Sequence, residues 1–329
     1  MRASACLLLT LIVLPAGAPV VAAAPEPSPY ALFAAQEARI AAIGYRLTTA
    51  NAGWCAAIQP QFGWLLGDPR LYDAKHRADA LAAYGAGDAD TPYVAAVAPG
   101  SPAATAGVRP GTPIAAVNGA PVPAADNSEP FSRIAAIEAL LGALPPASSV
   151  RIDGGSAAAI EVAPAPGCVT DFRLEPSARV GAFASGRVIR VNTGLVEFAG
   201  DDAELAAAIA HELAHNILRH PARLSEAGVD RGLAKQFGRN ARLFRQTEVE
   251  ADRLSVWLLA GAGYDPHAAE RFWTRFGKQK GSPLIQPGTH PRWRARVAAL
   301  AAESAAIDAA RSAGRPLEPP LVAAPPPLE

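Results

Sequence analysis

The segment AAIAHELAHNILRH, residues 207–220, constrains the fold of this chain more than any other stretch. Apolar side chains recur at every fourth position and form one side of a helix: Leu205, Ile209, Leu213 and Ile217. His211 and His215 fall roughly on the opposite side. Asp201 followed by Glu204 is typical of a capped helix start. Because both sides need burial, the sequence predicts a central helix over residues 201–219.

The two histidines predict a metal site. Histidines one turn apart on a buried helical face direct their imidazoles at one zinc ion. Glu212 projects beside His211, where it can take a proton from metal-bound water and act as general base.

The HExxH pattern resembles that of gluzincins, in which the third ligand is a glutamate on a later helix. The segment FRQTEVEADRLSVWLLAGAGYDP, residues 244–266, supplies such a helix, which should stop at Gly261-Ala262-Gly263. Glu248 and Asp252 lie four residues apart and therefore on one helical face, whereas Glu250 points elsewhere. We expect Glu248 to bind the metal. Asp252 is the expected acceptor for the second nitrogen of a metal-bound histidine.

Three motifs follow one another in the order of a known family: AHELAHNILRH, then EVEAD with AGAGYDP behind it, then THPRWRARV. They resemble the HExxH zinc peptidases (gluzincins) that include the CAAX prenyl proteases. Within that family the chain is similar to the soluble periplasmic branch carrying a PDZ-like domain. The resemblance covers about residues 165–300. It implies one Zn²⁺ per chain at His211, His215 and Glu248, with Glu212 as general base.

The third motif contains His290 and Arg296. Pro291 suits the first turn of a helix running through Val297, so His290 should lie near a helix N-terminus, where the dipole favours a neutral imidazole. His290 is expected either to donate to the oxyanion or to occupy the open zinc position at rest; a third alternative is a simple helix cap. Arg296 is expected to brace this loop.

The middle of the chain resembles the core of a bacterial-protease PDZ domain. YVAAVAPGSPAATAGVRPGTPIAAVNGAPV, residues 93–122, contains two strand-like runs, a short helix and an Asn118-Gly119 hairpin turn. Gly111-Thr112 replaces the usual Gly-Asp. Such domains bind a C-terminal or extended peptide by strand addition. The alternative is a small β domain without a ligand.

The N-terminus is typical of a secretory signal peptide. Arg2 precedes an apolar run, Leu7 to Leu14, and small residues lead to a cleavage site near Ala24. The alternative is a buried N-terminal helix. Cys6 would leave with this segment, and an even count of two cysteines in an exported chain favours a Cys55–Cys168 disulfide over two free thiols.

The predicted fold class is α+β: a mostly helical zincin-like domain with a small edge sheet containing RVIRVN, plus a small β-rich PDZ-like domain. The predicted parts are a signal peptide (1–24), a helical segment packing on the peptidase (25–59), the PDZ-like domain (60–164, core 90–163), the peptidase domain (165–312) and a disordered Pro-rich tail (313–329).

The expected function is an exported zinc endopeptidase of periplasmic envelope quality control, soluble or peripherally membrane-associated. Its expected substrates are unfolded or misassembled envelope proteins. The 30 basic and 30 acidic residues cancel, so no nucleic-acid partner is expected, and no transmembrane segment is expected in the mature chain. The alternatives are a PDZ-type adaptor with a vestigial metal site and a zinc enzyme that hydrolyses something other than protein.

Overall fold

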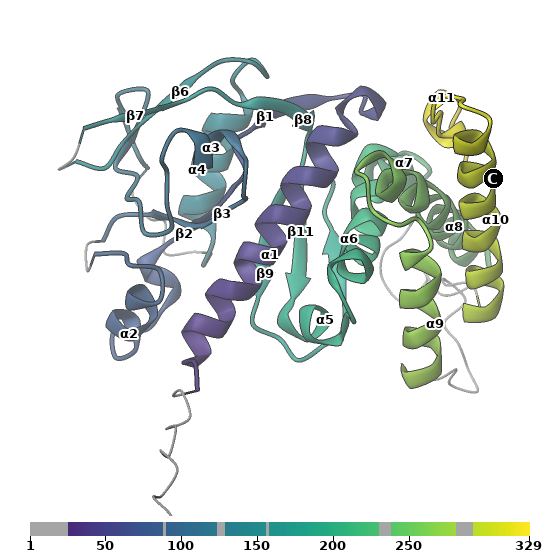
Figure 1. The fold of residues 1–329 in the computed structure, drawn as a ribbon, viewed down its shortest axis with the longest axis horizontal. Helices are drawn as coiled ribbons and strands as arrows, with labels where there is room; N and C mark the ends of the chain where they lie inside the picture. The colour runs from purple at the N-terminus through teal and green to yellow at the C-terminus, as the bar shows by residue number, and fades with distance from the viewer. Residues whose placement is uncertain (1–25, 88–89, 124–128, 156–157, 230–237, 281–291) are drawn as a thin grey trace, which may run out of the picture.

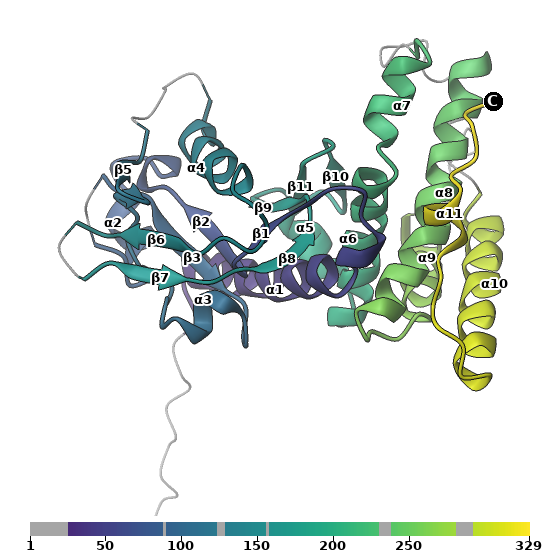
Figure 2. The ribbon, with the colours of Figure 1, turned by 90° about the horizontal axis from the view of Figure 1, so that it is seen from above.

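The structure is a computed structural model that describes residues 26–87, 90–123, 129–155, 158–229, 238–280 and 292–329. The predicted signal peptide lies outside the described residues. Figures 1 and 2 show two parts on either side of a long N-terminal helix: several small sheets with short helices on one side, and a group of longer helices on the other. The α+β class is therefore confirmed.

Helix α6 (Asp202–Ile217) is the predicted central helix, and its start follows the predicted cap. The Asp201 side chain accepts a hydrogen bond from the backbone N–H of Glu204 at 2.8 Å. The Glu204 carboxylate accepts from the backbone N–H of Gly200 and forms two 3.0 Å contacts with Arg275. Leu205, Ile209 and Leu213 are fully buried, so α6 is a core element.

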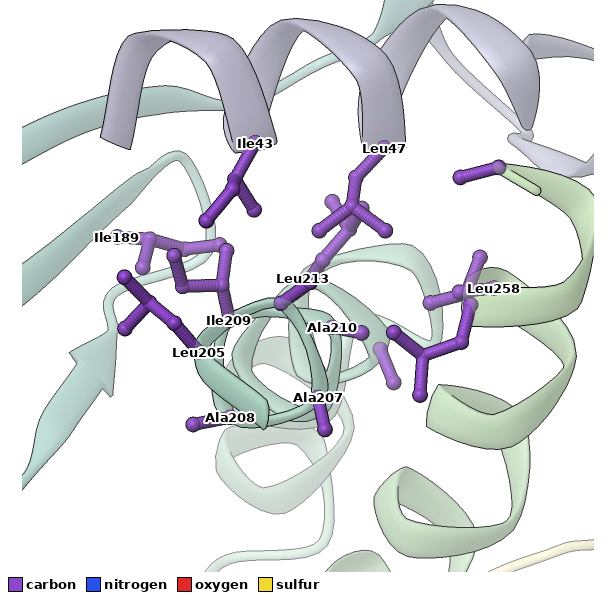
Figure 3. Close-up of a cluster of buried hydrophobic side chains, with 14 of the residues drawn as sticks. Ile43, Leu47, Ile189, Leu205, Ala207, Ala208, Ile209, Ala210, Leu213 and Leu258 are labelled. Atoms are coloured by element: carbon purple, nitrogen blue, oxygen red, sulfur yellow. The ribbon is translucent and has the colours of Figure 1, made fainter. Parts of the chain in front are cut away.

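Helix α1 (Pro29–Ala50) begins where the Ser28 hydroxyl accepts from the N–H of Ala31, with Pro29 in the first turn. Ile43 and Leu47 on its inner face point toward α6 (Figure 3). The N-terminal helix therefore packs on the part of the chain that holds the two histidines.

Further helices belong to the same part of the chain. They are α5 (Thr193–Phe198), α7 (His220–Glu226), α8 (Gly238–Gly261), α9 (Ala268–Lys280) and α10 (Trp293–Ser312). Helices α8 and α9 contact α6, and α10 contacts α8 and α9. Helix α8 ends at Gly261, as its sequence predicts.

A three-stranded sheet covers another side of α6. Its order is β10-β11-β9, with β11 (Val188–Asn192) parallel to β9 (Asp171–Glu175) and antiparallel to β10 (Ala182–Ala184). Strand β11 is the predicted RVIRVN strand. Because β10 is one of the two edge strands of this sheet and contacts α6, this edge lies beside the helix that carries the histidines.

A disulfide joins Cys55, after the short 3-10 helix η1 (Ala52–Trp54), to Cys168, with the Cα atoms 5.4 Å apart. This confirms the predicted bridge. Next to it, β1 (Ile58–Gln61) pairs antiparallel with β8 (Ala165–Cys168), and Gln61 lies opposite Ala165. The chain between β1 and β8 thus leaves and re-enters the main body at one two-stranded ribbon.

The inserted region, residues 62–164, has its own core. Its strands are β2 (Trp64–Gly67), β3 (Tyr93–Val97), β4 (Ala116–Val117), β5 (Ala120–Pro121), β6 (Val150–Asp153) and β7 (Ile160–Val162). Its helices are η2 (Pro69–Leu71), α2 (Arg77–Ala82), α3 (Pro102–Thr105) and α4 (Ser132–Gly142). Asn118 and Gly119, at φ 51° and 80°, form the predicted tight turn between β4 and β5.

The C-terminal tail differs from the prediction of a disordered segment. Residues 320–323 form the short helix α11 (Pro320–Ala323), and Leu321 is buried in the main core. Backbone groups further on are bound by α7 and α8: Arg223 donates to the carbonyl of Pro326 at 2.7 Å and Gln246 to that of Pro327 at 2.7 Å. Proline-rich composition disfavours a helix or sheet ladder, but here side chains of the folded body supply the hydrogen bonds.

Among the described residues, no helix is both long and apolar enough to cross a bilayer.

Candidate metal centre

Helix α6 places the two histidines as predicted. The Nε2 atoms of His211 and His215 lie 3.2 Å apart, and both residues face away from the side of α6 that packs on α1. The four-residue spacing carries this geometry, because residues i and i+4 lie one above the other on a helix.

Helix α8 brings Glu248 to the same point. One carboxylate oxygen lies 3.5 Å from Nε2 of His211, and the other lies 3.6 Å from Nε2 of His215. Bonds of about 2.0–2.2 Å to a tetrahedral zinc ion place ligand atoms about 3.3–3.6 Å apart. With one ligand atom from each residue, the donor atoms of His211, His215 and Glu248 lie within 4.8 Å of one another, so the group could hold a zinc ion.

Asp252 lies one turn after Glu248 on α8 and holds the other nitrogen of His211. Its Oδ1 is 2.9 Å from Nδ1 of His211. A proton on Nδ1 leaves Nε2 as the ligand atom, which faces His215 and Glu248. Asp252 is thus placed where the sequence expects an acceptor behind a metal-bound histidine.

Charge in this pocket favours a cation. Burial alone lowers the pKa of His211, but its contacts with Asp252 and Glu248 raise it to about 9. His215 behaves in the opposite way, because burial and the nearby His211 hold its pKa well below the usual range. The carboxylates of Asp252 and Glu248 therefore favour positive charge at this site.

Glu212 lies between α6 and the edge strand β10. Its carboxylate accepts a hydrogen bond from the backbone of Ala184, and burial raises its pKa. A carboxylate with a raised pKa takes up a proton more readily than an exposed one does. The position and the environment of Glu212 suit a general base.

Arg296, on α10, is buried behind the same site. Its guanidinium binds Asp252 at 2.5 Å and stacks on Trp273, with Cζ 3.2 Å from the ring centroid. Trp273 in turn contacts the ring of His211. Arg296 therefore supports the Asp252–His211 pair. His290 and Pro291 lie outside the described residues, so the structure does not place them.

Two groups beside the site are missed by the sequence pattern. The sequence pattern gives His220, directly after the predicted helix, no role in the site, and it predicts that Glu250 points elsewhere. In the structure Nδ1 of His220 lies 2.8 Å from Nδ1 of His215, and Nε2 of His220 lies 3.0 Å from Glu250. The contact arises because α6 ends at Ile217, two residues before the predicted end, and Arg219 then adopts a left-handed conformation with φ 54°. Glycine is the usual residue in this conformation, and none stands here in the sequence, so the turn could not be predicted.

His76 and His267 lie on the surface, each with 46% of its side chain exposed. His76 pairs with Asp73, and His267 pairs with Glu270 and Asp308. Neither belongs to the metal group.

Comparisons with known proteins match the same part of the chain. Residues 157–304 match the profile of Peptidase family M48. The chain is 32% identical over 148 residues to the mitochondrial metalloendopeptidase OMA1 of Arabidopsis thaliana, covering 39% of this chain and 30% of the relative. It is 30% identical over 144 residues to OMA1 of Schizosaccharomyces pombe, covering 37% and 42%.

The chain is also 29% identical over 146 residues to the putative beta-barrel assembly-enhancing protease of Vibrio cholerae, covering 34% of this chain and 30% of the relative. It thus spans less than half the length of these curated relatives. The matched region contains both helices that carry the metal group. Residues 157–304 are therefore similar to peptidase family M48 and contain a His-His-Glu group that could hold a metal ion.

Proposed function

We propose that this protein is a zinc-dependent endopeptidase that cleaves unfolded or extended polypeptides. One observation carries the proposal: one donor atom each from His211, His215 and Glu248 lies within 4.8 Å of the others, beside Glu212, within a region that matches peptidase family M48. A complete donor set favours an enzyme over an adaptor with a vestigial site.

Zinc bound here would lower the pKa of water and polarise the scissile carbonyl. The residues of the chain then supply the proton movements. Glu212 takes the proton from the attacking water and returns it to the leaving amine. Asp252 keeps His211 in the tautomer that presents Nε2, and Arg296 holds Asp252 in place.

The edge strand β10 supports an extended substrate. In the described part of the chain, β10 pairs with β11 on one side only, and Phe183 in its centre is 55% exposed. A substrate segment that adds to β10 as a strand would pass Glu212, which already binds Ala184 of that strand. Strand addition requires extended backbone, so folded proteins are poor substrates.

His290 remains a proposal from sequence alone. It either donates a hydrogen bond to the oxyanion or occupies the open zinc position at rest. For His290→Ala, lower turnover with zinc intact supports the oxyanion role and raised basal turnover supports the plug. Unchanged turnover removes His290 from the chemistry.

We further propose that residues 60–164 form a PDZ-like module that recruits a peptide or C-terminus. A strand, β2, and a helix, α4, flank a cleft lined in part by Trp64, Leu66 and Leu141. The signal-like segment 1–24 and the disulfide support export to the periplasm, where misassembled envelope proteins are the proposed substrates. One relative is named as a putative beta-barrel assembly-enhancing protease, which agrees with this setting.

Proteolysis of casein separates these possibilities. Wild type with zinc should cleave it, chelator should stop cleavage, and Glu212→Gln should be inactive. Cleavage by Glu212→Gln at the wild-type rate would reject the mechanism. A zinc-bound wild type that binds casein without cleaving it would favour the adaptor. Cross-linking partners of Glu212→Gln in the periplasm would then identify the substrates.

A further inference from the structure

His220 lies directly behind the metal ligand His215, although its sequence position predicts only a helix end. The chain leaves α6 after Ile217, turns at Arg219 and begins α7 at His220. This turn returns the imidazole to the metal site. His220 is 1% exposed, so its two ring nitrogens need partners inside the protein.

Only one arrangement of protons satisfies the chain of contacts. His215 presents Nε2 to the metal group, so its Nδ1 carries the proton. That proton is donated to Nδ1 of His220 at 2.8 Å. His220 then carries its own proton on Nε2 and donates it to the Glu250 carboxylate at 3.0 Å. Both histidines stay neutral and every nitrogen has a partner.

Glu250 is held in turn from two sides. Arg223, on α7, donates to one carboxylate oxygen at 2.7 Å, and Gln246, one turn earlier on α8, donates to the other at 2.9 Å. The same two side chains bind the carbonyl groups of Pro326 and Pro327. The carboxylate therefore has a fixed position, and the line of hydrogen bonds extends from His215 to the C-terminal segment.

We propose that His220 and Glu250 are positioning residues that orient His215 for zinc. This inference rests on the metal site of the proposed function and adds to it. His211 receives its orientation from a carboxylate in direct contact, Asp252, whereas His215 receives it from Glu250 through an interposed imidazole. The two metal histidines are thus oriented by separate carboxylates on one helix, α8.

Zinc affinity of the full chain tests this role without any measurement of proteolysis. Metal-free protein is titrated with Zn²⁺ against a chelator of known affinity. His220→Leu removes both hydrogen bonds and should weaken zinc binding about 10- to 100-fold, the usual effect of losing a partner behind a metal ligand. His220→Gln offers an amide oxygen to His215 and an amide N–H to Glu250, and should restore most of the affinity.

Leu224→Ala is the matched control, because Leu224 is buried on the same helix but belongs to a different cluster. It should lower the melting temperature and leave zinc affinity unchanged. If His220→Leu does not fold, Glu250→Gln tests the same line and should also weaken zinc binding. If folded variants at both positions bind zinc with wild-type affinity, the inference is wrong, while the proposed peptidase function is unaffected. A wild-type chain that binds no zinc overturns the metal site itself.

Discussion

The Oδ1 atom of Asp252 lies 2.9 Å from Nδ1 of His211, while Glu248, one turn earlier on the same helix, lies 3.5 Å from Nε2 of that ring. One face of α8 therefore contacts both nitrogens of one imidazole. This arrangement fixes the tautomer of His211 and its direction toward the metal group.

Asp252→Ala should weaken zinc binding about 10- to 100-fold, because His211 loses the acceptor that orients it. Chelator competition measures the affinity. Asp308→Ala, which removes a surface carboxylate that pairs with His267, serves as the control and should bind zinc as wild type does. Equal zinc affinities for wild type and Asp252→Ala would show that this contact does not contribute to zinc binding.

Glu212→Gln should keep the fold and the zinc ion and lose turnover about 10²- to 10⁴-fold, the usual effect of removing a general base. The amide keeps the shape of the side chain but takes up no proton. Zinc content and circular dichroism, measured with turnover, separate loss of chemistry from loss of structure. Loss of zinc in this variant would assign Glu212 a structural part in the site instead.

The Cys55–Cys168 bridge closes a loop with a sequence separation of 113 residues. In the chain-entropy account a loop of this length stabilises the folded state by about 5 kcal/mol. Replacing both cysteines by serine should lower the free energy of unfolding by up to that amount in denaturant titrations. Thiol labelling of denatured, unreduced wild type should find neither cysteine free. Labelling of both would contradict the bridge.

Glu37, on α1, predicts a pH-dependent stability. Burial raises its pKa from 4.5 to about 7, and its hydrogen bond with Tyr84 opposes this only in part. Between about pH 4.5 and 7 the folded chain keeps a proton that the unfolded chain has lost. The free energy of unfolding should therefore fall as the pH rises through this range, on the order of 3 kcal/mol in total.

Glu37→Gln removes the titrating group at constant shape. The difference in unfolding free energy between this variant and wild type should grow in favour of the variant as the pH rises from 4.5 to 8. Denaturant titrations at several pH values measure the difference. A difference that does not change with pH would show that Glu37 titrates near its ordinary value.

The inserted region can be removed at a defined point, because Gln61 and Ala165 lie opposite each other in the β1–β8 pair. Replacing residues 62–164 by Asn-Gly should close these strands as a tight hairpin. If the region recruits substrate, this variant should cleave a short peptide at the wild-type rate and a large unfolded protein more slowly.

A point variant controls for one of the contacts that are lost in that experiment. Glu138 on α4 pairs with Arg173 on β9 at 2.5 Å, so the deletion also removes an ion pair of the main body. Glu138→Gln in the full chain breaks the pair alone and should leave both activities intact. Equal loss of both activities in the deletion variant would mean that the inserted region is structural.

Much of the metal site was predictable from sequence, because helical periodicity fixes angles between neighbouring residues. A spacing of four residues places His211 above His215, and Glu248 above Asp252, in any α-helix. The cap at Asp201 and the turn at Asn118-Gly119 were predictable for the same reason: each depends on a few adjacent residues.

The tertiary structure decided what depends on contacts between distant segments. No local pattern indicates that Arg219 adopts a left-handed conformation, so the contact of His220 with His215 and Glu250 could not be predicted. The tail shows the same limit: its composition predicts disorder, but Arg223 and Gln246, far away in sequence, bind its backbone. Local sequence therefore determined the helices and the spacing of the metal ligands. Only the packing of those helices decided which polar groups support the ligands, because buried polar groups take the partners that the fold brings within hydrogen-bonding distance.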